Sequence, residues 1–168
     1  MERVIATKEQ LDALEDDARP VRARPPASFE LLAQAHRLFD ARALAMPRDY
    51  ERILRAHDGI DHVWRTANGA VMSVFGHREL FAQRAAADAA VVSAVIIAAS
   101  DDGEQVALVP GPMELPAAVV RNAQGRITGR FPSATAWLEW IHGENSAALD
   151  RARLRRKANL KVTQVVER

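Results

Sequence analysis

The chain has 168 residues, of which 48% are hydrophobic and 27% charged, a balance typical of one globular domain with a proper core. It contains no cysteine, which excludes disulfide bonds, thiolate metal sites and a cysteine nucleophile. The formal net charge of +1 is unevenly distributed: residues 144–168 carry seven basic and three acidic side chains, a net +4 that leaves −3 for residues 1–143.

The N-terminal segment combines a short predicted helix with a linker. Thr7 and Gln10 have the spacing of a capping box, which predicts a helix over residues 8–17. Residues 19–26 contain three prolines and three arginines, and this composition favours an extended linker.

Two helices are predicted next. Ser28 is a suitable N-cap for residues 29–40, where apolar side chains recur at helical spacing. Pro47 suits the first turn of the following helix, because its missing N–H would have no intrahelical partner there. Gly59 is well placed to end that helix.

The pattern then changes to strands. Asn68-Gly69 predicts a hairpin between a strand at Val63-Trp64 and one at Val71–Phe75, and residues 78–90 are predicted to be helical. Four further strands follow, at Val91–Ala98, Gln105–Val109, Ala118–Arg121 and Arg126–Phe131. The last strand alternates, with Ile127, Gly129 and Phe131 on a face that we expect to be covered.

Helices close the chain. Ser133 is a good cap for residues 134–142, where Trp137, Trp140 and Ile141 share one side and form the predicted lid over the sheet. A separate basic helix is predicted over residues 145–157. The expected fold is therefore α+β, with a mainly antiparallel sheet of about five or six strands flanked by helices.

This pattern divides the chain into three parts. Residues 1–27 form an N-terminal helix and linker, residues 28–142 the α+β domain, and residues 143–168 a basic C-terminal helix and tail. The N-terminus lacks a secretory apolar segment, and the most apolar run, Val91–Ala99, is too short to span a membrane. We expect a cytoplasmic protein with no membrane partner.

The order of short motifs across the domain resembles the SUKH superfamily, the group that includes the yeast cell-wall-assembly regulators. Met46 stands where that family usually has leucine, and Asp58 where asparagine is common. The residues that carry the resemblance are Pro47, Asp49, Tyr50, Leu54, Asp58-Gly59, Phe75-Gly76, Glu79-Leu80, Asp102-Gly103, Phe131-Pro132-Ser133, Trp137-Leu138 and Trp140-Ile141.

The resemblance implies a SUKH-like fold and a binding module rather than an enzyme. Bacterial members of the family are commonly immunity proteins that bind and neutralise a cognate toxin, and the family supplies no fixed catalytic residues. We therefore expect a toxin-binding immunity protein with no catalytic residue and no cofactor. Two alternatives are a regulatory or secretion-associated adaptor, which would dock through the chain ends, and a metal-dependent hydrolase.

The hydrolase alternative depends on four clustered side chains, since two imidazoles and two carboxylates can bind a divalent metal. They are His57, Asp58, Asp61 and His62. However, a helix ending at Gly59 would separate the pairs spaced four residues apart. We therefore predict a solvated helix terminus here, and no metal.

The candidate partner-binding residues are polar or aromatic side chains near predicted turns. They are Asp58, Asp61, His62, Trp64, Arg65, Asp101 and Asp102. The basic run 151–157 has no accompanying aromatic platform, so we interpret it as a solvated helix face rather than a nucleic-acid site. The oligomeric state is not indicated by the sequence.

Overall fold

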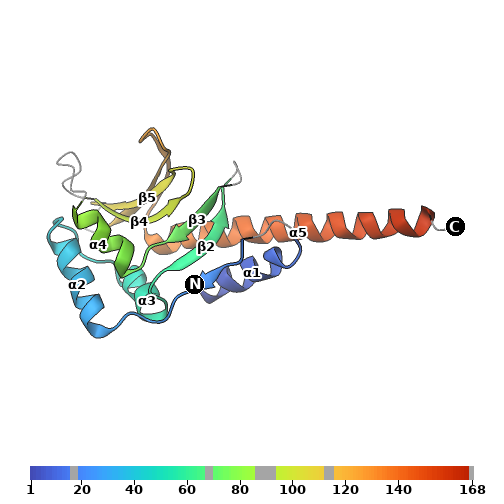
Figure 1. Ribbon diagram of the computed structural model, residues 1–168. Coiled ribbons are helices and arrows are strands. Elements are labelled where there is room, and N and C mark those ends of the chain that lie inside the picture. Colours follow the sequence, from blue (N-terminus) through green and yellow to red (C-terminus); the bar gives the residue numbers. More distant parts are fainter. Residues whose placement is uncertain (16–18, 67–69, 86–93, 112–115, 167–168) are drawn as a thin grey trace.

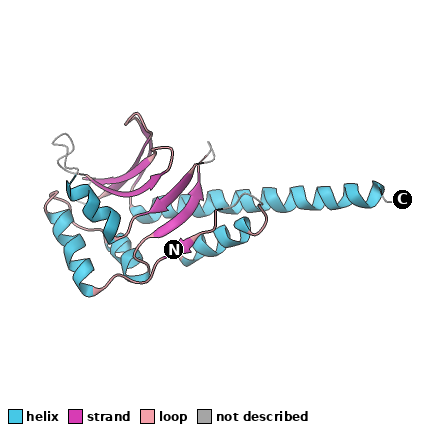
Figure 2. Ribbon diagram, in the orientation of Figure 1, coloured by secondary structure: helices cyan, strands magenta, loops and turns pink. Residues whose placement is uncertain are grey.

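The computed structural model describes residues 1–15, 19–66, 70–85, 94–111 and 116–166. Within them the chain forms five helices and a seven-stranded antiparallel sheet (Figures 1 and 2). The predicted α+β class is confirmed, although the sheet has seven strands instead of five or six.

The sheet is a simple meander, because each strand pairs with the next one in the chain. The strands are β1 (Arg22–Ala23), β2 (Ile60–Arg65), β3 (Val71–Val74), β4 (Val95–Ser100), β5 (Gln105–Val109), β6 (Ala117–Arg121) and β7 (Ile127–Phe131). The additional strand is β1, a two-residue piece of the predicted extended linker that pairs with Ile60 and Asp61. Two residues are too few for an alternating pattern to reveal.

The two N-terminal helices compare differently with their predictions. Helix α1 (Glu2–Asp12) begins directly after Met1, so the predicted start near residue 8 is wrong and Thr7 lies inside the helix. Helix α2 (Phe29–Asp40) has the predicted bounds, and the Ser28 hydroxyl accepts a hydrogen bond from the Leu31 N–H at 3.3 Å, as a capping residue does.

The next two helices flank β2 and β3. Helix α3 (Arg48–Ala56) has Pro47 as its N-cap rather than in its first turn, and it ends three residues before Gly59. Helix α4 (His77–Ala85) begins one residue before its predicted start, and the rest of that predicted helix, with residues 91–93 of the following strand and Asn68-Gly69, lies outside the described residues.

The C-terminal helix α5 (Ala134–Val166) is one continuous element, so the prediction of two helices separated near Gly143 is wrong. A single glycine costs a helix about 1 kcal/mol, and the turns beyond it bury Asn145 and Leu149. Figure 1 shows α5 passing along the sheet with α1 beside it, and its C-terminal half projecting away from the body.

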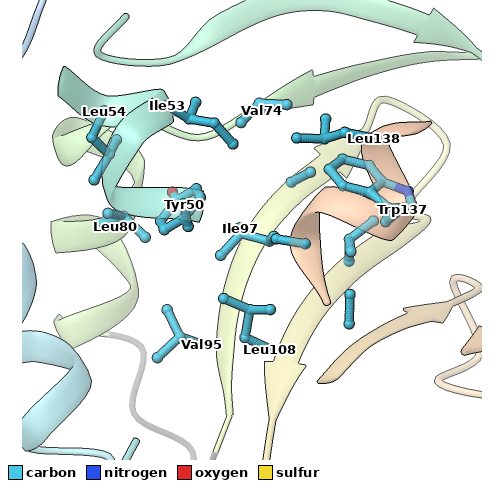
Figure 3. Close-up of a cluster of buried hydrophobic side chains, with 14 of the residues drawn as sticks. Tyr50, Ile53, Leu54, Val74, Leu80, Val95, Ile97, Leu108, Trp137 and Leu138 are labelled. Carbon is cyan, nitrogen blue, oxygen red and sulfur yellow. The ribbon is translucent and has the colours of Figure 1, made fainter. Parts of the chain in front are cut away.

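The core lies where α3, the central strands and the start of α5 meet. Figure 3 shows Tyr50 of α3 near Ile97 of β4, with Trp137 of α5 on the other side of the cluster. The predicted lid is confirmed for Trp137 and Ile141, which are buried, whereas Trp140 is 38% exposed.

The edge strand β7 departs from its predicted alternation. Phe131 packs against the core, as expected of the covered face. Ile127, which we expected on that face, is exposed. β7 pairs only with β6, and its first residues therefore lie at the margin of the sheet.

Candidate functional site

The seven predicted contact residues do not form one surface. Asp58 and Asp61 belong to a junction between α3, β2 and α4, and His62 lies in an irregular part of β2. Asp101 and Asp102 form the turn between β4 and β5. Trp64 and Arg65 line one pocket together, and that pocket is the candidate site.

Asp58 is buried and acts as a structural cap. One carboxylate oxygen accepts a hydrogen bond from the backbone N–H of His77 at 2.7 Å, and the other contacts His77 Nδ1. A carboxylate at a helix N-terminus satisfies an N–H that lacks an intrahelical partner. Asp58 therefore fixes the start of α4, and its prediction as a partner contact is not supported by its position.

Asp61 is engaged in an ion-pair bridge. Arg24 donates to Asp61 at 2.7 Å and to both carboxylate oxygens of Glu79 at 2.8 Å. The hydrogen bond to Asp61 is the main cause that raises the pKa of Arg24. Glu79 also accepts from the Gly76 N–H at 3.1 Å, so the bridge joins the residue that follows β1 to β2 and α4.

Two glycines complete this junction. A β-carbon on Gly76 would lie 2.2 Å from the carbonyl oxygen of Asp58, and Gly59 has φ of +94°. The Tyr50 hydroxyl donates to the Phe75 carbonyl at 2.8 Å, and burial raises the pKa of Tyr50. Several residues that carry the family resemblance therefore have one shared role, which is to join helices to strands.

The four side chains of the hypothetical metal cluster have separate partners. His57 Nε2 lies 3.3 Å from Glu2, and His62 Nδ1 lies 3.0 Å from the Pro20 carbonyl oxygen. Asp58 and Asp61 are held by His77 and Arg24, as described above. No three histidine or carboxylate side chains converge on a metal position anywhere in the described residues. The chain after α3 is not helical, which removes the spacing that such a cluster would need.

At the β4–β5 turn the two aspartates differ. Asp101 accepts from the Val71 N–H at 2.7 Å and pairs with Arg19 at 2.8 Å, and the bond from Val71 is the main cause that lowers its pKa. Asp102 is exposed and accepts from the Ser100 hydroxyl. Asp102 thus bonds within its own turn, whereas Asp101 ties the turn to β3 and to Arg19.

The pocket, which we call the Trp64–Trp140 pocket, has a volume of about 650 Å³ and lies between α1, β2, the start of β5 and α5. It is lined by Lys8, Leu11, Glu15, Trp64, Arg65, Thr66, Glu104, Trp140, Glu144, Asn145, Ala148, Arg151 and Arg155.

Two indoles form one wall of the pocket. Trp64 stands opposite Met72 of β3, so both side chains point to the same face of the sheet. Trp140 projects from α5, and its ring meets that of Trp64 edge to face, with centroids 4.9 Å apart at 71°. Phe131 supports Trp140 from the other side at 5.7 Å. The aromatic wall is thus fixed by packing yet partly open to solvent.

Polar groups line the deeper part. Asn145 is 2% exposed and donates to the Val63 carbonyl at 3.1 Å, which ties α5 to β2. Thr66 is 8% exposed, and its hydroxyl has no hydrogen-bond partner within the described residues. The same holds for the buried Oε1 of Glu104. Burial, with a smaller effect of nearby Asp102, raises the pKa of Glu104.

Sequence reasoning found Trp64 and Arg65 but missed the rest of the pocket, which comes from segments far apart in the chain. One signal was present. Asn145 lies four residues after Ile141 and four before Leu149, so it is a polar residue on an otherwise apolar helix stripe. Glu104 and Thr66 gave no such signal, because polar residues at turns are ordinary.

No protein-family model matches the chain, and no curated protein matches it. Among the described helices, none is both long enough and apolar enough to cross a membrane.

Proposed function

We propose that this protein is a cytoplasmic, SUKH-type immunity protein that neutralises a cognate toxin by direct, stoichiometric binding at the Trp64–Trp140 pocket. The observation that carries the proposal is the pocket itself, in which a partly exposed tryptophan pair stands beside a rim of charged side chains. Tryptophan and arginine are the residues most enriched among the energetic hot spots of protein interfaces.

The arrangement around the pocket supports this choice. Asn145 ties α5 to β2 beside the pocket, and Trp140 packs against both Trp64 and Phe131, so these contacts hold the aromatic wall in place. A rigid aromatic anchor loses little conformational entropy when a partner binds, which favours tight association.

In the proposed mechanism the partner covers the pocket and thereby occludes a surface that the toxin needs. Trp140 contributes the largest apolar contact, because its ring is fixed by two aromatic neighbours. Arg151 and Arg155 at the rim attract acidic groups of the partner and raise the association rate.

The direct test is co-expression with the toxin domain encoded by a neighbouring gene. We expect rescued growth and a 1:1 complex on gel filtration. Trp140→Ala should weaken binding roughly 30-fold or more, as for a hot-spot residue worth about 2 kcal/mol. Phe29→Ala is the matched control, since Phe29 is an 81% exposed aromatic residue on α2 that does not line the pocket.

Two results would contradict the proposal. If the two proteins neither form a complex nor restore growth, the immunity function is wrong. If the complex forms but Trp140→Ala binds as tightly as Phe29→Ala, the partner uses another surface.

One observation favours the adaptor function as a second candidate. The C-terminal half of α5 projects from the body (Figure 2), and its Leu154 is 66% exposed among basic side chains. If the projecting helix is the docking element, Arg156→Gln with Lys157→Gln should abolish partner binding. If the pocket is the site, this pair should have little effect, because neither residue lines it.

A further inference from the structure

Two oxygen atoms in the Trp64–Trp140 pocket lack hydrogen-bond partners among the described residues. They are Oγ1 of Thr66 and Oε1 of Glu104, and both atoms are buried. Buried polar atoms in folded proteins are almost always paired, and leaving one unpaired costs free energy. The pocket therefore holds two acceptors that a bound group can satisfy.

Both acceptors line the same pocket as the indole of Trp64. Thr66 follows directly after the end of β2 at Arg65, and it lines the pocket together with Trp64. Met72 pairs with Trp64 on one side and with Ser100 on the other, and the Ser100 N–H donates to the Glu104 carbonyl at 2.8 Å. Glu104 thus lies at the end of the row that contains Trp64, Met72 and Ser100, and Thr66 lies just beyond Trp64 in the chain.

The other charges in the inner part of the pocket are already balanced. Lys8 is buried and pairs with Asp12. Arg65 lies 3.9 Å from Glu15. Glu104 is different, because its buried oxygen receives no donor from the described residues. The group that complements it carries positive charge and several N–H donors.

We propose that the Trp64–Trp140 pocket binds an arginine side chain of the partner protein, with the guanidinium donating to Glu104 and Thr66 and lying against an indole. Arginine fits better than lysine, because a planar guanidinium donates in two directions at once and stacks on aromatic rings. The partner's identity as a toxin rests on the proposed function, whereas the arginine specificity of the pocket does not.

The charged residues at the rim of the pocket indicate which residues lie beside this arginine in the partner. Arg151 and Arg155 are exposed on successive turns of α5 at the mouth of the pocket. A partner segment entering there meets positive charge first and the Glu104 carboxylate later. The complementary segment is one arginine flanked by acidic residues.

The test uses the purified full chain and three acetylated, amidated tripeptides. Each has glutamate at both ends, with arginine, lysine or the neutral isostere citrulline in the middle. Binding is followed by calorimetry and by tryptophan fluorescence, since two of the three tryptophans line the pocket. We expect saturable binding of the arginine peptide and about tenfold or greater weakening with citrulline, because a charge-assisted hydrogen bond is lost.

Variants locate the site. Glu104→Gln should weaken the arginine peptide about tenfold or more and remove the preference over citrulline. Glu30→Gln is the control, since Glu30 is an exposed glutamate on α2 outside the pocket, and it should bind as the unmodified protein does. Folding of each variant is checked by its thermal melt.

Several outcomes would overturn the inference. They are absence of saturable binding, equal binding of the citrulline peptide, lysine binding as tightly as arginine, or an unaltered preference in Glu104→Gln. Self-association of the protein that is lost in Glu104→Gln would instead assign the arginine to a second copy. Growth rescue that survives Glu104→Gln but not Trp140→Ala would refute the arginine contact while leaving the immunity function intact.

Discussion

At Glu104, the same unpaired carboxyl that lowers the stability of the fold would favour the arginine binding that we propose. Its Oε1 is buried without a partner in the described residues, and burial raises its pKa above the ordinary value of 4.5. The folded protein therefore binds a proton at this carboxyl more readily than the unfolded chain does. Functional sites often retain groups of this kind, because a ligand satisfies what the fold leaves unpaired.

This leads to a prediction about pH. A raised folded-state pKa means that the folded protein binds a proton more tightly than the unfolded chain, so stability is lost as pH rises from about 4.5 through the raised value. Glu104→Gln removes the charge and should raise the melting temperature at pH 7. Near pH 4 the gain should shrink, because the carboxyl of the unmodified protein is then largely protonated.

Thermal melts of the two proteins at pH 7 and pH 4 measure this difference. Glu9→Gln, at an exposed position of α1, serves as the control and should change the melting temperature little at either pH. A lower melting temperature for Glu104→Gln at pH 7 would show that the carboxylate has a stabilising partner after all.

Among the elements, α5 has the least expected geometry. It continues through Gly143, where a β-carbon would meet no atom within 4 Å. The helix is held at its start by Asp49 of α3, which accepts from the Thr135 N–H and hydroxyl, each at 2.7 Å. Asn145 holds it again at β2. Tertiary contacts on both sides of the glycine thus outweigh its weak helix propensity.

Gly143→Ala should therefore stabilise the protein by about 0.5–1 kcal/mol, because alanine loses less backbone entropy in a helix. Chemical denaturation gives the change in the free energy of unfolding. Gly125→Ala is the matched control: it also has open space, but its φ is +77°. That substitution should destabilise by about 1–2 kcal/mol. Equal signs for the two variants would contradict the assignment of Gly143 to a continuous helix.

The sequence predicts an element well when the residues that determine it lie within or next to that element. Helix α2 was predicted with its observed bounds, because Ser28 and the apolar stripe lie within the element itself. Strand β5 was predicted equally well, since the turn residues before it mark its start. Both elements depend on chemistry that the local sequence contains.

Elements fixed by distant contacts were predicted less well. Strand β1 exists because its two residues meet β2, and α5 continues past Gly143 because Asn145 reaches Val63. The pocket was largely missed for the same reason, since Glu104 and Thr66 become notable only when the fold leaves their oxygens unpaired. Asp58 was predicted on the surface but caps α4, because its partner His77 is nineteen residues away.

Across the whole molecule, α1 packs against α5, so segments from both ends of the chain lie side by side (Figure 1). Val4 of α1 belongs to the main core, and Leu11 is 4% exposed and lines the Trp64–Trp140 pocket. The helix therefore contributes to both the stability of the body and the shape of the candidate site.

Leu11→Ala should accordingly lower the free energy of unfolding by about 2–4 kcal/mol, as for a buried leucine. Leu154→Ala is the matched control, because this leucine also lies in a helix but is 66% exposed, and its effect should be about 0.5 kcal/mol or less. Denaturant titration of both variants checks the prediction. Similar losses for the two leucines would indicate that α1 is not part of the cooperative unit.

The packing of α1 against α5 also affects the order in which parts of the protein can fold during synthesis. Each strand of the meander meets its neighbour soon after both have left the ribosome, because consecutive strands pair. Helix α1 precedes the strands in the chain, whereas α5, with which it packs, follows the seven described strands. Helix α1 also contacts β2, so part of its surface can pack before α5 is made, but the candidate site is complete only once α5 has joined it.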